Sequence, residues 1–125
     1  MRTTLVLASL IAMTLPALAE GDPAKGMKVF ARCKACHDAT EPKNKSGPHL
    51  VGLFGRKAGS LIGFKYSDAM VTKGEEGLVW DAASLKAYVM DPRGYIEGNS
   101  MGFPGLKKEA DADNLVAWFE TLPKE

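Results

Sequence analysis

The stretch Cys33-Lys34-Ala35-Cys36-His37 decides how the rest of this sequence is interpreted. Two cysteines separated by two residues can add across the two vinyl groups of a haem and form two thioethers. The histidine that directly follows then lies under the macrocycle, where its imidazole can bind iron. The motif therefore predicts one covalently attached haem c, with Cys33 and Cys36 as its attachment points and His37 as an iron ligand.

The same two cysteines allow other interpretations. In an oxidising compartment they could form a disulfide, which would make the protein a structural or thiol-redox module. A redox dithiol is typically preceded by a strand and followed by a helix, whereas this motif comes at the end of a helical pattern. A zinc site is disfavoured because His49 is the one additional histidine that could join the motif as a soft ligand.

Residues 1–19 are predicted to be a signal peptide. Arg2 provides a positive start, an apolar run follows, and Ala17-Leu18-Ala19 forms the small-x-small pattern that signal peptidase recognises. The apolar run is too short to span a membrane comfortably. We therefore expect residues 20–125 to form the mature domain, exported to the periplasm and without stable insertion in the membrane.

The composition is that of one ordinary globular domain. Of the 125 residues, 46% are hydrophobic and 25% are charged. Sixteen basic residues stand against fifteen acidic ones, so the net charge does not favour a nucleic-acid partner. The chain is too short for a dinucleotide-binding fold with a separate substrate domain. Its two cysteines exclude a disulfide-rich scaffold.

A helix is expected to lead directly into the cysteine motif. Asp22 is a suitable N-cap, and Pro23 suits the first helical position. Met27 and Phe30 continue one face of this helix at helical spacing.

Three further helices are expected, which makes the domain all-α. One begins at Ser67 or Asp68 and ends at Gly74, and a stronger one begins near Asp81 and ends before Pro92. The last helix carries an apolar stripe made of Leu115, Trp118, Phe119 and Leu122. The stretches 38–64 and 94–105 are rich in glycine and proline and predict long loops. A buried haem would supply the rigid apolar core that such a small domain lacks.

The second axial position of the iron decides between an electron carrier and an open-site haem protein. Met101 lies in the glycine- and proline-rich loop 98–105, which can wrap a side chain over a ligand face. A thioether is a soft ligand that favours ferrous iron and raises the reduction potential. Met27 and Met90 fall on expected helices, where packing is the simpler role. Met101 is therefore predicted to be the second ligand.

Two other side chains compete for that position. Met70 lies in a short expected helix and is a weaker candidate. His49 is the runner-up, but it is only twelve residues from His37 and directly follows Pro48, so the opposite haem face is awkward for it to reach. A loop histidine is more often exposed to solvent or hydrogen-bonded.

An ordered set of residues extends from 21 to 123, far beyond the haem motif. It comprises Gly26, Phe30, the motif itself, the stretch 47–56, Tyr66, Trp80, Tyr88, Asp91-Pro92, Tyr95-Ile96, Met101 and Lys107-Lys108. With this set the sequence resembles the class I c-type cytochromes, both the mitochondrial cytochromes c and the bacterial cytochromes c2. The resemblance implies a small cytochrome c fold, in which helices and long loops wrap around one covalently bound haem.

The resemblance also implies roles for individual residues. The Pro48 carbonyl should accept the Nδ1 hydrogen of His37 and so fix the ring. Tyr88 matches a tyrosine near the methionine sulfur. The crossing of the first and last helices is matched by Gly26, Phe30 and Trp118. Positions around a buried haem propionate, which needs donors or a cation, are matched by Arg56, Tyr66 and Trp80.

Three positions depart from the family pattern. Met70 stands where relatives often have a polar side chain that helps to order a buried water. Asn99 and Ser100 stand where mitochondrial relatives have threonine and lysine.

Basic side chains gather near the haem motif. Residues 24–57 hold eight of them against two acidic ones. Such a positive surface would speed encounter with acidic partners and make docking weak and salt-sensitive. The residues that match or neighbour the docking positions of the family are Lys28, Arg32, Lys34, Lys45, Arg93, Lys107 and Lys108.

The resemblance implies a soluble periplasmic one-electron carrier and not an enzyme. It would take electrons from a quinol-oxidising, bc1-type complex and deliver them to a photosynthetic reaction centre or a terminal oxidase. We expect a monomer that docks transiently on these membrane redox complexes. The alternative is an open-site haem enzyme or a gas- or ligand-binding haem domain, for which the sequence offers no good distal acid or base beyond His49.

Overall fold

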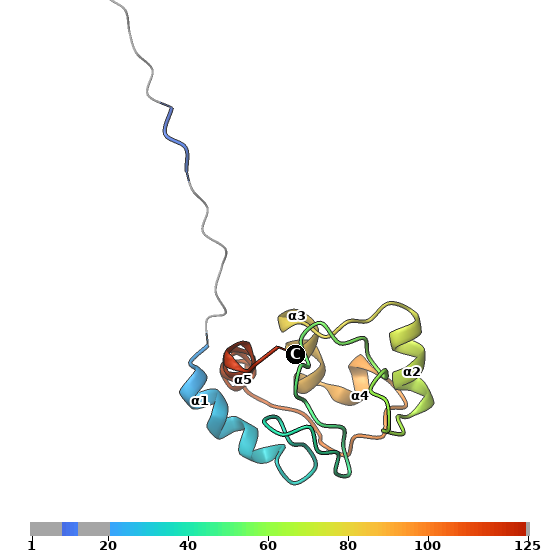
Figure 1. Cartoon of the computed structure of the whole chain (residues 1–125). Coiled ribbons are helices and arrows are strands. Elements are labelled where there is room, and N and C mark those ends of the chain that lie inside the picture. Colours follow the sequence, from blue (N-terminus) through green and yellow to red (C-terminus); the bar gives the residue numbers. More distant parts are fainter. Residues whose placement is uncertain (1–8, 13–20, 125) are drawn as a thin grey trace, which may run out of the picture.

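The computed structural model describes residues 9–12 and 21–124, and it places helices around a central region of loops (Figure 1). Most of the predicted signal peptide, residues 1–8 and 13–19, lies outside the described residues. The elements are α1 (Pro23–Val29), the 3-10 turn η1 (Phe30–Arg32), α2 (Asp68–Glu75), α3 (Ala82–Met90), α4 (Pro92–Tyr95) and α5 (Glu109–Thr121). Within the described residues there is no strand, and one isolated bridge joins Lys57 to Val79. The all-α prediction is confirmed.

The first helix begins where its capping signal predicts. The Asp22 carboxylate accepts the backbone N–H of Ala24 at 2.9 Å, and Pro23 occupies the first turn. The buried face differs from the one expected, because Met27 is 52% exposed while Gly26, Val29 and Phe30 are buried. The packing role expected for Met27 is therefore wrong. Neighbouring faces of a helix share the same period, and contact with α5 decides which of them is buried.

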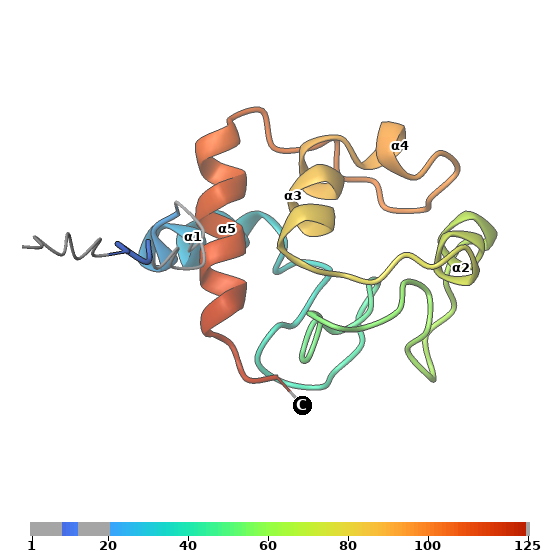
Figure 2. The ribbon, with the colours of Figure 1, turned by 90° about the horizontal axis from the view of Figure 1, so that it is seen from above.

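Helices α1 and α5 cross steeply and form one side of the molecule (Figures 1 and 2). Gly26 lies at the crossing, where an added Cβ would approach the Asn114 carbonyl and come within 2.8 Å of Trp118 Cβ. Phe30 lies against Trp118 with ring centroids 4.8 Å apart. These contacts confirm the expected crossing of the first and last helices.

Helix α3 packs against the other side of α5, and α2 lies at the far edge (Figure 2). The starts of α2 and α3 agree with the predictions, since Ser67 accepts the Met70 N–H at 3.1 Å and Asp81 accepts the Ser84 N–H at 2.8 Å. Helix α2 ends at Glu75, one residue beyond the expected stop. Helix α4 is a single turn that the sequence did not predict, and its last two residues, Gly94 and Tyr95, fall in the stretch 94–105 that was wrongly expected to be loop.

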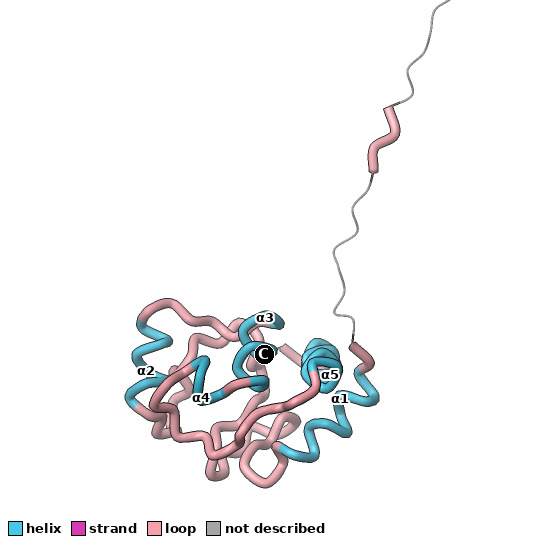
Figure 3. The backbone as a smooth tube through the Cα atoms, turned by 180° about the vertical axis from the view of Figure 1, so that it is seen from behind, coloured by secondary structure: helices cyan, strands magenta, loops and turns pink. Residues whose placement is uncertain are grey.

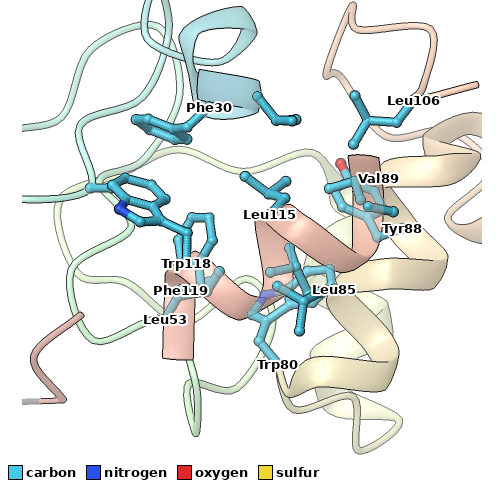
Figure 4. Close-up of a cluster of buried hydrophobic side chains, with 14 of the residues drawn as sticks. Phe30, Leu53, Trp80, Leu85, Tyr88, Val89, Leu106, Leu115, Trp118 and Phe119 are labelled. Carbon is cyan, nitrogen blue, oxygen red and sulfur yellow. The ribbon is translucent and has the colours of Figure 1, made fainter. Parts of the chain in front are cut away.

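Long loops make up most of the remaining fold, as expected (Figure 3). Buried aromatic and aliphatic side chains from α3, α5 and these loops gather on one inner wall (Figure 4). The described helices include none with the length and apolar character of a membrane-spanning segment.

Stability is expected to depend on pH through the α3 cap. Asp81 and Ser84 form a reciprocal capping box, and hydrogen bonds from Ser84 hold the pKa of the Asp81 carboxyl below its ordinary value. Because the pKa of this carboxyl is lower in the folded than in the unfolded protein, ionised Asp81 stabilises the fold at pH values above the unfolded-state pKa. This stabilisation is lost as the pH falls through the folded-state pKa. Asp81→Ala should therefore cost about 1 kcal/mol at neutral pH and less in acid, measured by urea unfolding.

Asp81→Asn is the matched control, because asparagine caps a helix equally well and does not titrate. This variant should lose less stability on acidification than the unmodified protein. Equal acid sensitivity of the two proteins would contradict a role for the Asp81 carboxylate.

Helices α3 and α5 are also joined by an ion-pair triad. The Lys86 ammonium lies 2.7 Å from Glu109 Oε1 and 2.8 Å from Asp113 Oδ1, and both hydrogen bonds raise its pKa. Lys86→Met should lower the midpoint of thermal unfolding at low salt, because it leaves two carboxylates facing each other. The difference should shrink at about 1 M salt, where the Debye length is about 3 Å.

The control is Lys73→Met, since Lys73 pairs only with Glu76, at 3.6 Å, in the described structure. It should leave the midpoint almost unchanged. An equal loss in both variants would contradict a specific role for the triad.

Candidate functional site

The helices and loops enclose a cavity of about 660 Å³. This volume lies within the range of about 300–1,000 Å³ that is typical of ligand and cofactor sites. Every residue labelled in Figure 4 except Trp118 also lines it, so its wall is mainly apolar. Cys33, Cys36, His37 and Met101 all lie on this wall. The tertiary structure thus brings the four predicted haem-binding residues to one cavity.

The orientation of His37 follows from its contact with Pro48. The Nδ1 atom lies 2.7 Å from the Pro48 carbonyl oxygen, which can only accept a hydrogen bond. Nδ1 must therefore carry the hydrogen, and Nε2 keeps the lone pair that a metal needs. Burial lowers the pKa of His37, which favours the neutral ring that iron requires.

The loop that carries Pro48 can approach His37 because residue 47 is a glycine. A Cβ at this position would lie 2.5 Å from His37 Cε1. The predicted contact between Pro48 and His37 is thus present in the structure.

The cysteines differ from those of a reactive dithiol. Cys33 is partly buried, and desolvation raises the pKa of its thiol to about 11. A thiol with a raised pKa is protonated at neutral pH and is a poor nucleophile for disulfide exchange. Cys36 is exposed beside it at the cavity rim. The raised pKa of Cys33 disfavours a thiol-redox module, and the position of both cysteines on the cavity wall suits haem attachment.

Met101 and Tyr88 meet on the cavity wall. The Tyr88 hydroxyl lies 3.8 Å from the Met101 sulfur, as the family resemblance implies. Burial raises the pKa of Tyr88 to about 12, so its hydroxyl keeps its hydrogen at neutral pH. The Tyr88 ring stacks obliquely on Trp80 at a centroid distance of 5.1 Å. Met70 also lines the cavity, so a second thioether faces the same space.

The three residues matched to a haem propionate come together on the wall. Arg56, Tyr66 and Trp80 all line the cavity. Arg56 donates to the carbonyl oxygens of His49 at 2.8 Å and of Val51 at 2.6 Å. These bonds hold the guanidinium in place. A fixed guanidinium at the wall suits a buried carboxylate.

His49 is buried, so of the two positions considered from the sequence, exposed to solvent or hydrogen-bonded, the exposed one is wrong. Its backbone N–H donates to Asn44 Oδ1 at 2.9 Å, and its carbonyl accepts from Arg56. The residues that line the cavity include Pro48 and Leu50 but not His49. The cavity geometry therefore favours Met101 over His49 as the second ligand, and it offers no support for His49 as a distal acid or base.

The seven predicted docking residues are all exposed. Arg32, Lys107 and Lys108 line one open groove together with Phe103. Two of the seven also make contacts within the chain, since Arg32 lies 3.4 Å from Asp111 Oδ2 and Lys45 donates to the Lys34 carbonyl at 3.0 Å.

Asn99 was not predicted to be a site residue from the sequence, yet its side chain contacts both Met101 and Tyr88. One signal could have found it. An asparagine side chain often accepts the backbone N–H two residues further on, and Met101 stands at that spacing.

The comparisons with known proteins agree with this site. The family model of cytochrome c matches residues 23–123. Cytochrome c-550 of Ancylobacter novellus is 49% identical over 80% of this chain and 94% of its own length. Cytochrome c2 of Afifella marina is 50% identical over 79% of this chain and 81% of its own length.

A solved structure shows the same fold. Cytochrome cH from Methylobacterium extorquens superposes with a TM-score of 0.73 at 42% identity, over 81% of this chain and 99% of that one. The cavity, its cysteine motif, the matching family model and these relatives lead to one conclusion. The chain belongs to the cytochrome c family and is an electron carrier, not an enzyme, with one haem c bound covalently through its cysteine motif.

Proposed function

We propose that this protein is a periplasmic one-electron carrier in which His37 and Met101 are the two axial ligands of the haem iron. The observation that carries the proposal is their shared cavity, where His37 is oriented by Pro48 and the Met101 sulfur faces the Tyr88 hydroxyl. Cys33 and Cys36 lie on the same wall as attachment points. The signal peptide, residues 1–19, would deliver the chain to the compartment where this haem is attached.

The bound haem supplies one-electron chemistry by alternating between ferric and ferrous iron. The chain supplies two ligands of different character. The imidazole of His37 is a strong donor fixed by its second nitrogen, and the Met101 thioether favours the ferrous state. The apolar wall excludes water, which further raises the potential.

The rigid surroundings of these ligands suit rapid electron transfer. The Pro48 carbonyl accepts a hydrogen bond from His37, and Arg56 donates to two carbonyl oxygens of the same loop. The Tyr88 ring packs against the rings of Trp80 and Tyr95. Ligands held in this way move little when the iron changes charge, so little free energy is spent on reorganisation.

We infer that the partners are membrane redox complexes with acidic docking faces. The donor would be a quinol-oxidising, bc1-type complex, and the acceptor a photosynthetic reaction centre or a terminal oxidase. The exposed basic residues Arg32, Lys107 and Lys108 around one groove support this proposal. We expect the protein to act as a monomer that docks on these complexes weakly and transiently.

The partner proposal is tested by the rate of reduction by a purified quinol-oxidising complex. The double variant Lys107→Glu and Lys108→Glu should slow this reaction by about tenfold at low salt, and the difference should disappear at high salt. Lys65→Glu combined with Lys73→Glu, beside and on the remote helix α2, makes the same change of charge and should change the rate little. Equal effects of the two double variants would contradict a docking role for the groove.

A separate test addresses the axial ligands. Ferric protein with Met101 bound should take up cyanide far more slowly than an open-site haem protein. Rapid cyanide binding would rule out a closed methionine ligand and would favour the open-site alternative.

A further inference from the structure

The segment that carries Met101 has little regular structure of its own. It connects α4 to α5 through residues 96–108, which contain neither helix nor strand. Gly98, Gly102 and Gly105 add to its conformational freedom. A methionine on such a segment needs contacts with the rest of the fold to keep its sulfur in one place.

The side chain of Asn99 supplies such contacts. Its Nδ2 donates to the carbonyl oxygen of Pro92 at 2.7 Å and to that of Ile96 at 2.8 Å. Its Oδ1 accepts the backbone N–H of Met101 at 2.9 Å and lies 3.4 Å from the Tyr88 hydroxyl. An asparagine amide has two N–H donors and two acceptor lone pairs, so all four are used.

The two carbonyls that hold Asn99 belong to one of the best buried parts of the molecule. The side chains of Pro92 and Ile96 are both fully buried. Asn99 therefore connects the backbone of Met101 to the α4 turn, which is anchored in the core. If Asn99 were removed, these two buried carbonyl oxygens would lose a hydrogen bond that water cannot easily replace, and this loss costs free energy.

Asn99 and Met101 also share one hydroxyl group. The Tyr88 hydroxyl carries a single hydrogen and has Asn99 Oδ1 at 3.4 Å and the Met101 sulfur at 3.8 Å. Both distances are long, as expected for one donor divided between two acceptors. The amide oxygen thus takes part of a hydrogen bond that the thioether would otherwise receive alone.

We propose that Asn99 is a positioning residue with two effects on Met101: it anchors the methionine backbone to the α4 turn, and it draws the Tyr88 hydroxyl partly away from the sulfur. The inference rests on the proposed role of Met101 as a ligand. A thioether that receives less of the hydrogen bond is a better electron donor to ferric iron. Asn99 therefore lowers the reduction potential relative to a chain in which Tyr88 bonds to the sulfur alone.

Few other side chains fit this position. A threonine has one hydroxyl hydrogen and cannot donate to both carbonyls. An aspartate keeps the acceptor oxygens but turns a negative charge toward the Pro92 and Ile96 carbonyls. A threonine at position 99, as in the mitochondrial relatives, could therefore not make both of the bonds to the α4 turn that Asn99 makes.

The anchor is tested by hydrogen exchange at the Met101 amide in the ferrous holoprotein. Asn99→Ala should accelerate exchange at this amide by about tenfold or more, because its acceptor is lost. Asn99→Asp should also accelerate it, because the two bonds to the α4 turn are lost. The matched control is Glu97→Gln, an exposed residue of the same segment, which should leave exchange unchanged. Exchange as slow in both Asn99 variants as in the unmodified protein would overturn the anchor.

The effect on the sulfur is tested by the reduction potential in a double-variant cycle. Asn99→Ala should raise the potential when Tyr88 is present and have a much smaller effect in combination with Tyr88→Phe. An equal shift of the potential with Tyr88 and with Tyr88→Phe would contradict the proposal that Asn99 and Met101 share the Tyr88 hydroxyl. Loosening of the segment alone would shift the potential equally in both proteins, because it does not require Tyr88. If Asn99→Ala gives no holoprotein, Asn99→Thr takes its place, with the same expectation of Tyr88 dependence.

The ligand role of Met101 and the positioning role of Asn99 can be tested separately. The unmodified ferric protein should show the near-red charge-transfer band of methionine sulfur bound to iron. Absence of that band would contradict Met101 ligation and, with it, the effect on the potential, while the exchange experiment still decides the anchor. Presence of the band with unchanged exchange would overturn the role of Asn99 and leave the proposed function intact.

Discussion

Replacing Met101 by alanine is expected to abolish the weak near-red charge-transfer band of the ferric protein and to lower its reduction potential. The band arises from sulfur bound to ferric iron, so it reports this ligand directly. The potential should fall by on the order of 100 mV or more, since axial ligands set haem potentials over about 0.8 V. The absorption spectrum and a redox titration of the purified, periplasmically matured protein measure both effects.

Met70→Ala is the matched control, because Met70 is the other methionine that lines the cavity. It should keep the band, although it shortens a side chain on the cavity wall. Loss of the band in Met70→Ala together with its retention in Met101→Ala would assign the second ligand to Met70. Met101→Ala should also bind cyanide much faster than the unmodified protein.

Replacing Gly26 by alanine is expected to destabilise the protein strongly. Helix propensity alone predicts the opposite, a gain of roughly 0.5–1 kcal/mol for alanine inside a helix. The tertiary contact should outweigh that gain, because the new Cβ would collide with the Asn114 carbonyl on α5 and lie 2.8 Å from Trp118 Cβ. Backbone and Cβ atoms cannot rotate away, so the two helices must separate.

We expect the free energy of unfolding to fall by at least about 2 kcal/mol, measured by urea unfolding of the holoprotein. Gly26→Val should cost more. Met27→Ala is the matched control on the same helix, where the side chain is 52% exposed, and it should change stability by less than about 0.5 kcal/mol. A stabilised Gly26→Ala variant would show that α1 and α5 do not approach closely at this residue.

Helix starts were predictable because their signals are local. Asp22, Ser67 and Asp81 each accept a backbone N–H within three residues, and each of their helices begins as predicted. Helix α4 was missed because four residues are too few to show a period. The buried face of α1 was misjudged at Met27, since a short helix offers two adjacent faces and only α5 distinguishes them.

The sequence by itself determined the family, the covalent haem and the all-α class. A five-residue motif specifies the attachment chemistry, and the ordered residues after it are specific to one fold. The ligand roles of His37 and Met101, the docking residues and the signal peptide stay predictions. The sequence can suggest these residues because few side chains bind haem iron and because signal peptidase recognises only small residues at its cleavage site.

The tertiary structure alone decided how distant segments complete the site. Whether His49 reaches the cavity and whether Met70 lines it depends on how the loop 38–64 and α2 pack against each other and around the cavity. The four hydrogen bonds of Asn99 likewise need α3, the α4 turn and the Met101 segment in their folded places. Local patterns act over a few residues, whereas these contacts form only when the chain closes around its core.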